Sequence, residues 1–212
     1  MKLQIALDRL SKEECISILA ETSPYVDWIE VGTGVIKQYG VSLIEYIKKQ
    51  YPEKIIVADM KTCYAGKHEE KKAFEAGAEI TTVMAYADNQ TILDMLAVAK
   101  KHNKRVMVDL LGVKSKTRVE ELKALNVDLV SLHVGKDMQQ NTQLQVDVFD
   151  LVKGIEGLEV AIAGGINLKN LDEVMAKGPN VLIVGSTITS VANPGDIAKQ
   201  MKGMINHFEN NH

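Results

Sequence analysis

The sequence is short of cysteine, and it has neither an excess of basic residues nor a long apolar run. Its two cysteines, Cys15 and Cys63, lack the spacing of metal ligands or of a disulfide framework, which indicates a reduced, intracellular protein. The formal net charge is only -3, so the clustered positive charge typical of nucleic-acid-binding proteins is absent. We therefore expect no nucleic-acid partner.

The chain also lacks the apolar segments that membrane insertion or secretion requires. No apolar run approaches the ~20 residues that a helix needs to cross a bilayer, so we expect no membrane role. The first residues, MKLQIALD, lack the long apolar region and the small-residue cleavage site of a signal peptide. We expect a cytoplasmic protein whose 212 residues form a single domain, residues 1–212.

What the chain does contain is a regular alternation of short apolar runs with longer amphipathic segments. Short runs rich in Val, Ile, Leu and Ala are typical of buried parallel strands. The expected strands are Leu3–Asp8, Val26–Gly32, Lys54–Lys61, Glu79–Ala85, Arg105–Leu111, Asp128–His133, Glu159–Ala163 and Asn180–Val184. Helices are expected between them, for example after the capping box of Ser11 and Glu14 and along Thr91–Lys101.

Strand–helix units at nearly even spacing predict a single closed (β/α)8 TIM barrel of the α/β class. An open doubly wound sheet shows the same alternation, but it usually carries a glycine-rich fingerprint after its first strand. Here Asp8, Arg9 and Leu10 stand at that point, which favours the barrel. Because ~200 residues is near the lower limit for such barrels, the loops should be short.

Ionisable residues end most of the predicted strands, at the end of the barrel where active sites lie in this fold. They are Asp8, Glu30, Asp59 with Lys61, Asp109 and His133. An aspartate at a strand end is often a helix N-cap. That interpretation is weak for Asp8, because Ser11 caps the next helix, and for Asp59, because the next helix should begin near Lys67. For Asp109 a structural hydrogen bond and a catalytic role are equally open.

The spacing of these residues indicates their chemistry. Asp59 and Lys61 are two residues apart, so they should face the same side of an extended strand. A lysine among carboxylates stays charged and is suited to stabilising an oxyanion. Glu30 and Asp59 stand on adjacent strands and could share a Mg²⁺ ion, which prefers hard oxygen ligands. We predict that His133 transfers protons.

Two glycine-containing turns follow the last two predicted strands. The seventh strand runs into Gly164 and Gly165, and the eighth into Gly185 and Ser186. The loops after strands seven and eight form the phosphate site of many barrels, and glycine lets backbone N–H groups approach the phosphate. We therefore predict a phosphate site at Gly165, Gly185 and Ser186, and a phosphorylated sugar as substrate.

The whole chain resembles the orotidine monophosphate decarboxylase suprafamily. Within it, the chain is most similar to the 3-hexulose-6-phosphate synthases and next to the 3-keto-L-gulonate-6-phosphate decarboxylases. The matching segments are LQIALD, VDWIEVGT, VADMKT, FEAGAEITTV, VMVDLLGV, LHVGKD, VAIAGGIN and IVGSTIT.

The resemblance implies roles for individual residues. Asp8 would contact substrate hydroxyls, Glu30 and Asp59 would bind Mg²⁺, and Lys61 would hold an enediolate oxygen. Two further positions, Asp109 and Ala163, match the synthases, whereas the decarboxylases have Glu and Thr there. The decarboxylases have Arg where this chain has Lys136, a substrate-binding candidate that matches neither pattern cleanly.

One position departs from the suprafamily signature Asp-x-Lys-x-x-Asp. Its last aspartate, which in the family reaches the neighbouring subunit's active site, is Tyr64 in this chain. The resemblance implies a homodimeric, Mg²⁺-dependent carbon–carbon lyase, and the leading hypothesis is aldol condensation of formaldehyde with ribulose 5-phosphate. The alternatives are decarboxylation of a 3-keto sugar-acid phosphate, and a non-catalytic sugar-phosphate-binding protein, which Tyr64 favours.

Overall fold

The structure is a computed structural model that describes residues 1–135 and 148–211. The strands are β1 (Lys2–Leu7), β2 (Trp28–Val31), β3 (Ile55–Thr62), β4 (Ile80–Met84), β5 (Arg105–Asp109), β6 (Leu129–His133), β7 (Glu159–Ala163) and β8 (Val181–Val184). The helices are α1 (Lys12–Thr22), α2 (Thr33–Tyr39), α3 (Ser42–Gln50), α4 (Gly66–Glu75), α5 (Asn89–His102), α6 (Lys116–Ala124), the 3₁₀ helix η2 (Val148–Leu151), α8 (Leu171–Met175), α9 (Ser186–Thr189) and α10 (Pro194–Asn211).

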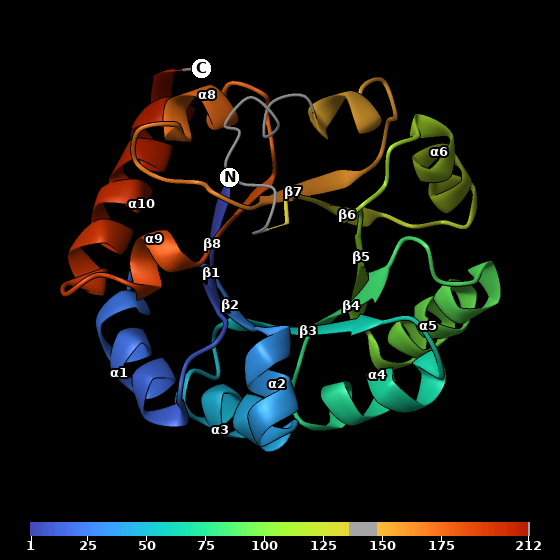
Figure 1. Ribbon diagram of the computed structural model, residues 1–212, viewed down its shortest axis with the longest axis horizontal. Coiled ribbons are helices and arrows are strands. Elements are labelled where there is room, and N and C mark those ends of the chain that lie inside the picture. The colour runs from blue at the N-terminus through green and yellow to red at the C-terminus, as the bar shows by residue number, and fades with distance from the viewer. Residues whose placement is uncertain (136–147, 212) are drawn as a thin grey trace.

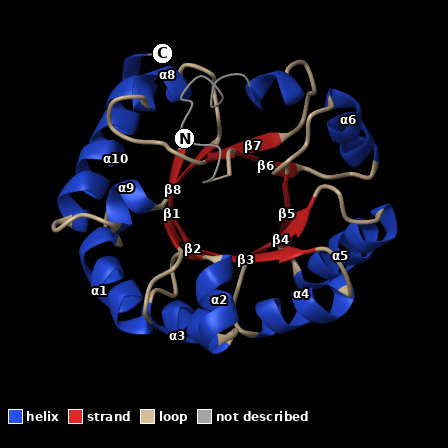
Figure 2. Cartoon of the chain, in the orientation of Figure 1, coloured by secondary structure: helices blue, strands red, loops and turns tan. Residues whose placement is uncertain are grey.

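The strands form one closed parallel barrel in sequence order, with β8 paired back onto β1. Figures 1 and 2 show the helices as a ring outside this barrel. The predicted (β/α)8 fold is therefore confirmed, and all eight predicted strands are present. Among the described residues no helix is both long and apolar enough to cross a membrane.

Several strands begin later than predicted. The polar residue before each of them does not join the strand, and its side chain instead forms a hydrogen bond with the neighbouring strand. At three positions a side-chain oxygen accepts a backbone N–H from the preceding strand, at 2.7 or 2.8 Å. The pairs are Asp27 with Leu3, Glu79 with Ile56, and Asn180 with Val160. These contacts satisfy N–H groups at the N-terminal end of the barrel, opposite the predicted site.

Two apolar cores hold the fold together. The larger one lies between barrel and helices and includes Cys15, which is fully buried as a small core residue. The smaller one fills the barrel itself, and its buried members are Trp28, Val57, Ile80, Met107, Leu129, Ala161, Ala163, Val181 and Ile183. Because this interior is packed with side chains, the barrel leaves space for a ligand at the ends of its strands and not along its axis.

The local helix signals are confirmed. The Ser11 hydroxyl accepts the backbone N–H of Glu14, and the Glu14 carboxylate accepts the N–H of Ser11, so the capping box starts α1. The apolar stripe predicted along Thr91–Lys101 lies within α5 and buries Ile92 and Met95.

Glu70 is a fully buried carboxyl on α4 and lies outside the predicted site. One oxygen accepts the hydroxyl of Thr81 at 3.2 Å, whereas Oε2 has no hydrogen-bond partner among the described residues. Burial raises the pKa of Glu70 from 4.5 to about 8. A buried ionised carboxyl is costly, so the neutral form is favoured in the folded state.

We predict that Glu70→Gln flattens the pH dependence of stability. Because the folded-state pKa of Glu70 lies above the unfolded value, its contribution is full below pH 4.5 and is lost as pH rises through about 8. At pH 8 the variant should exceed the parent by about 1–3 kcal/mol in free energy of unfolding. Urea denaturation at several pH values measures this. The exposed Glu75→Gln on the same helix is the control, and an equal effect there contradicts the assignment.

Candidate active site

A cavity of about 590 Å³ opens at the C-terminal ends of the barrel strands. Its walls include every predicted site residue that the structure describes: Asp8, Glu30, Asp59, Lys61, Asp109, His133, Gly165, Gly185 and Ser186. The closed barrel brings these residues together although they are spread from the first strand to the last. Lys136 lies outside the described residues.

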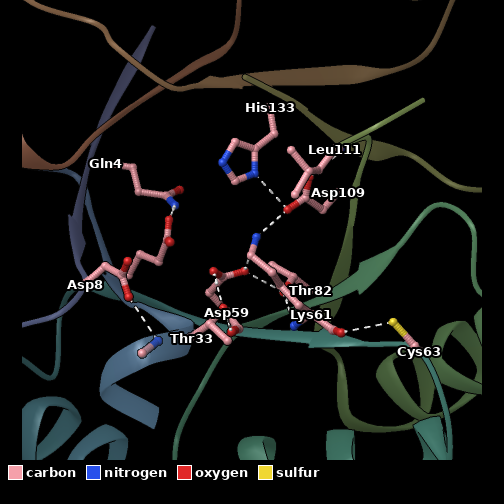
Figure 3. Close-up of polar contacts among 12 residues, drawn as sticks. Gln4, Asp8, Thr33, Asp59, Lys61, Cys63, Thr82, Asp109, Leu111 and His133 are labelled. Atoms are coloured by element: carbon pink, nitrogen blue, oxygen red, sulfur yellow. Dashed lines mark hydrogen bonds and ion pairs between the residues drawn. The ribbon is translucent and has the colours of Figure 1, made fainter. Parts of the chain in front are cut away.

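Lys61 lies at the centre of a charged cluster that spans β3, β5 and β6 (Figure 3). Its Nζ donates to Asp109 Oδ2 at 2.5 Å and lies 3.3 Å from Asp59 Oδ1. The same Asp109 oxygen lies 3.0 Å from His133 Nδ1. Asp109 therefore links the lysine and the histidine. A structural hydrogen bond and a catalytic role, which the sequence left open for Asp109, are compatible with each other.

Mutual attraction keeps the lysine and Asp109 ionised. Burial disfavours the Lys61 ammonium, but the charges of Asp59 and Asp109 outweigh burial and raise the pKa of Lys61 above its ordinary value. Burial would raise the pKa of Asp109, but hydrogen bonds and charges from His133 and Lys61 lower it to about 2. A fixed ammonium in such a cavity can stabilise negative charge that develops on a substrate oxygen.

Asp59 is held from two sides by hydroxyl groups. Thr33 Oγ1 lies 2.7 Å from Asp59 Oδ2, and Thr82 Oγ1 donates to Asp59 Oδ1 at 2.8 Å. Asp59 and Lys61 do share the cavity, but not through the regular extended strand expected from their spacing. Lys61 has a left-handed φ of 47°, so the backbone bends at this point.

Glu30 lies on the cavity wall beside Asp59. Burial, followed by the negative charge of Asp59, raises the pKa of Glu30, and Lys61 offsets only part of this. The Gln4 amide Nε2 donates to Glu30 Oε2 at 2.5 Å, while the buried Gln4 Oε1 has no partner among the described residues. The ionised form of Glu30 therefore lacks sufficient positive charge nearby, and a cation between Glu30 and Asp59 would supply it.

The donor chemistry of this pair suits Mg²⁺ better than a softer metal. Mg²⁺ is usually held by one or two carboxylates while it keeps several waters, so Glu30 and Asp59 supply enough protein ligands. Within residues 1–135 and 148–211 no group of three or more His, Cys, Asp or Glu is placed to hold a metal ion. A site with all its ligands from side chains, as zinc prefers, is therefore not found in the described part of the chain.

Asp8 also caps a helix, though not the helix that follows it in sequence. Its Oδ1 accepts the backbone N–H of Gly34 at 2.9 Å, in the first turn of α2. The prediction that Ser11, and not Asp8, caps the next helix is confirmed, whereas the contact of Asp8 with the neighbouring α2 was not foreseen. The other carboxylate oxygen, Oδ2, lies 3.3 Å from Arg9 Nε.

The glycine turns differ in what each residue contributes. Gly164 has a φ of 106°, and a Cβ atom there would lie 2.2 Å from the Val134 carbonyl oxygen, so the packing of the β7 loop requires glycine. Gly165 also has a positive φ, of 68°. A Cβ on Gly185 would meet nothing closer than the Ala6 carbonyl oxygen, at 3.6 Å. Gly185 is therefore not needed for packing, and it lines the cavity.

Sequence reasoning missed the polar residues that hold the charged ones in place. These are Gln4, Thr33 and Thr82, which bond Glu30 or Asp59. Alternation along β1 and β4 could have placed Gln4 and Thr82 inside the barrel. Tyr64 is not among the residues that line the cavity, and its side chain is 82% exposed.

Known proteins share this barrel and much of its sequence. Residues 1–201 match the family described as orotidine 5'-phosphate decarboxylase / HUMPS. The 3-hexulose-6-phosphate synthase of Bacillus subtilis (strain 168) is 38% identical over 97% of this chain and 99% of its own. That of Mycobacterium gastri is 39% identical over 97% of this chain and 100% of its own.

Solved structures agree with these relatives. The 3-hexulose-6-phosphate synthase from Salmonella typhimurium has a TM-score of 0.93 at 34% identity, covering 98% of this chain and 99% of that one. KGPDC from Streptococcus mutans, solved with a ligand bound, has a TM-score of 0.90 at 25% identity, with 97% of both chains covered. The predicted enzyme class, a lyase, is confirmed by these relatives, and the chain belongs to the orotidine 5'-phosphate decarboxylase / HUMPS family.

Proposed function

We propose that the protein is a Mg²⁺-dependent aldehyde-lyase that condenses formaldehyde with ribulose 5-phosphate. The observation that carries this proposal is the contact of one buried carboxylate, Asp109, with both the Lys61 ammonium and the His133 ring. This arrangement places a fixed positive charge and a proton carrier in one cavity. Relatives named 3-hexulose-6-phosphate synthase, at 38% and 39% identity, support the substrate assignment.

The proton transfers of the reaction follow from the hydrogen bonds of His133. Its Nδ1 faces Asp109 Oδ2, so Nδ1 carries the proton and Nε2 is left to act as a base. In the first step Nε2 removes a proton from C1 of the ketose, and the electron pair of that C–H bond forms the enediolate. The C1 carbon then attacks formaldehyde, and the formaldehyde oxygen takes a proton from His133.

Lys61 stabilises the enediolate through its charge. Its ammonium is held by Asp59 and Asp109, so the charge is in place before the substrate oxygen becomes negative. Glu30 and Asp59 would hold Mg²⁺, which supplies further positive charge beside the substrate oxygens when bound. Asp8, an exposed residue that lines the cavity, would accept hydrogen bonds from substrate hydroxyls.

The phosphate is assigned to the turns after β7 and β8. Gly165, Gly185 and Ser186 line the same cavity as Lys61, and they follow the paired strands β7 and β8. Glycine leaves backbone N–H groups open to an anion, and the Ser186 hydroxyl adds a further donor. A phosphorylated sugar bound there would extend toward the charged cluster.

We further infer a homodimer, in which Tyr64 lies at the subunit interface. Tyr64 and Tyr86 follow the neighbouring strands β3 and β4, and they are 82% and 66% exposed. Exposed aromatic side chains are typical of protein interfaces. The cytoplasmic location expected from the sequence remains a prediction.

Lys61→Ala should reduce kcat by about 10²–10³-fold, since the variant lacks the charge that stabilises the enediolate. The assay measures condensation of formaldehyde with ribulose 5-phosphate with and without Mg²⁺, and decarboxylation of 3-keto-L-gulonate 6-phosphate in parallel. The control is Lys67→Ala, an exposed lysine that pairs with Asp94 on the surface. Folding is checked by circular dichroism in both variants.

The outcomes of this assay separate the three functions. Condensation that requires Mg²⁺ and Lys61 supports the proposal. Decarboxylation without condensation would replace it with the carboxy-lyase. Binding of ribulose 5-phosphate without turnover of either substrate would identify a non-catalytic binding protein.

Gly185→Val should weaken ribulose 5-phosphate binding at least about tenfold, because a branched side chain would obstruct the approach of phosphate to the backbone. Isothermal titration calorimetry measures the affinity. Gly203→Ala on α10 is the control, since a Cβ there meets no atom within 4 Å. Equal affinity of the Gly185 variant and the parent, with the fold intact, would remove the phosphate from this turn.

Tyr64→Asp should raise kcat/KM for formaldehyde condensation, by restoring the carboxylate of the suprafamily signature. A phenol can donate a hydrogen bond where a carboxylate can only accept. Leu93→Asp on α5 is the control, because it adds the same charge at an exposed apolar position that lies outside the signature and the cavity. No gain from Tyr64→Asp would show that the parent is not a weakened synthase.

A further inference from the structure

The strand β3 carries an irregularity at its functional end. It pairs with β4 in register at Ala58 with Thr81 and again at Thr62 with Val83. Residues 59–61 of β3 therefore lie opposite the single residue Thr82 of β4. Lys61 closes this bulge with a φ of 47°, a conformation that a residue with a side chain rarely adopts. Something in the surroundings must hold Lys61 there.

The hydroxyl of Thr82 is the group that bonds both sides of the bulge. Thr82 Oγ1 accepts the backbone N–H of Lys61 at 2.8 Å and donates to Asp59 Oδ1 at 2.8 Å (Figure 3). These directions are fixed, because an amide N–H cannot accept and an ionised carboxylate cannot donate. Thr82 lines the cavity but is only 4% exposed, so both bonds are largely shielded from solvent.

These two bonds decide where the ammonium of Lys61 lies. Held in the bulge, Lys61 extends past β4 and its Nζ reaches Asp109 on β5 at 2.5 Å, while remaining 3.3 Å from Asp59. Without the hydroxyl, the backbone N–H of Lys61 would lose its acceptor in a partly buried position, and a change of φ would bring it to another acceptor. Such a change would displace the ammonium and would free Asp59 to rotate.

We propose that Thr82 is a positioning residue, which sets the geometry of Lys61 and Asp59 for the reaction through one hydroxyl. The expected loss of kcat rests on the proposed function. The expected effect on the conformation of Lys61 and Asp59 does not depend on which substrate the protein uses. Thr82 acts through Lys61 and Asp59, and not by exchanging protons with the substrate.

The chain offers a matched control in the preceding residue. Thr81 is also fully buried on β4, but its hydroxyl points outward to Glu70 on α4. Thr81→Val and Thr82→Val thus remove one buried hydroxyl each, on opposite sides of the barrel wall. Thr82→Ser keeps the hydroxyl, and Thr82→Ala removes it without adding volume if valine prevents folding.

The experiment compares kcat and KM of these variants in the condensation assay with Mg²⁺. Thr82→Val should lower kcat about 10²-fold, as misplacement by ~1 Å does in active sites, while KM for ribulose 5-phosphate changes less than about threefold. Thr82→Ser should retain kcat within about threefold, and Thr81→Val should match the parent. Equal losses in the Val and Ser variants of Thr82, or no loss in either, overturn the proposal.

Crystal structures of the parent and of Thr82→Val separate this inference from the proposed function. If the parent lacks lyase activity, the proposed function fails. The φ angle of Lys61 in the two crystal structures still tests the role of Thr82. The inference expects Lys61 to leave its left-handed conformation and its Nζ to move away from Asp109 in the valine variant, or in Thr82→Ala. An unchanged Lys61 and Asp59 would overturn it.

Discussion

The ammonium of Lys61, held among buried carboxylates, is the interaction on which the rest of the site depends. Its partners Asp59 and Asp109 come from β3 and β5, and Glu30 from β2 lies beside them with a pKa raised by burial and by the charge of Asp59. Buried charges are stable only when they are paired, so none of these groups could stay ionised alone. Because the partners stand on different strands, closure of the barrel is what assembles the charge cluster.

The two ends of the barrel use polar side chains in opposite ways. At the N-terminal end, Asp27 and Glu79 each accept a backbone N–H of the preceding strand and pair with a half-buried lysine, Lys202 of α10 or Lys48 of α3. Those carboxylates are thereby fully used in holding the fold. At the C-terminal end Asp59 and Asp109 share the ammonium of Lys61, and Asp109 also contacts His133 Nδ1. The other ring nitrogen of His133 is left for a ligand in the cavity that His133 lines. The polar side chains of the N-terminal end thus stabilise the barrel, and those of the C-terminal end form the site.

The sequence could predict which residues reach this site, because strand ends can be found from apolar runs and every strand end meets the same cavity. The sequence could not predict the backbone conformation that brings these residues into the cavity. The bulge at Lys61 depends on a hydroxyl from β4, and the cap that Asp8 provides belongs to α2, which lies 25 or more residues along the chain. Neither contact leaves a local pattern. The requirement for glycine at position 164 likewise comes from another strand, because the Val134 carbonyl after β6 leaves no room for a Cβ atom there.

In the proposed homodimer, Tyr64 would bear on the balance of charge in this cluster. Three carboxylates, Glu30, Asp59 and Asp109, share the ammonium of Lys61, and a divalent cation would balance the charge that remains. In the resemblance to the suprafamily, a further aspartate reaches the site from the neighbouring subunit. In the proposed homodimer, a phenol at that position would add no negative charge to the site, and a phosphorylated, anionic sugar would be less strongly repelled. The substitution would then favour binding of the substrate, but it would remove an acceptor for a substrate hydroxyl during turnover. Binding and catalysis would therefore respond in opposite directions, because one change removes both a repulsive charge and a hydrogen-bond acceptor.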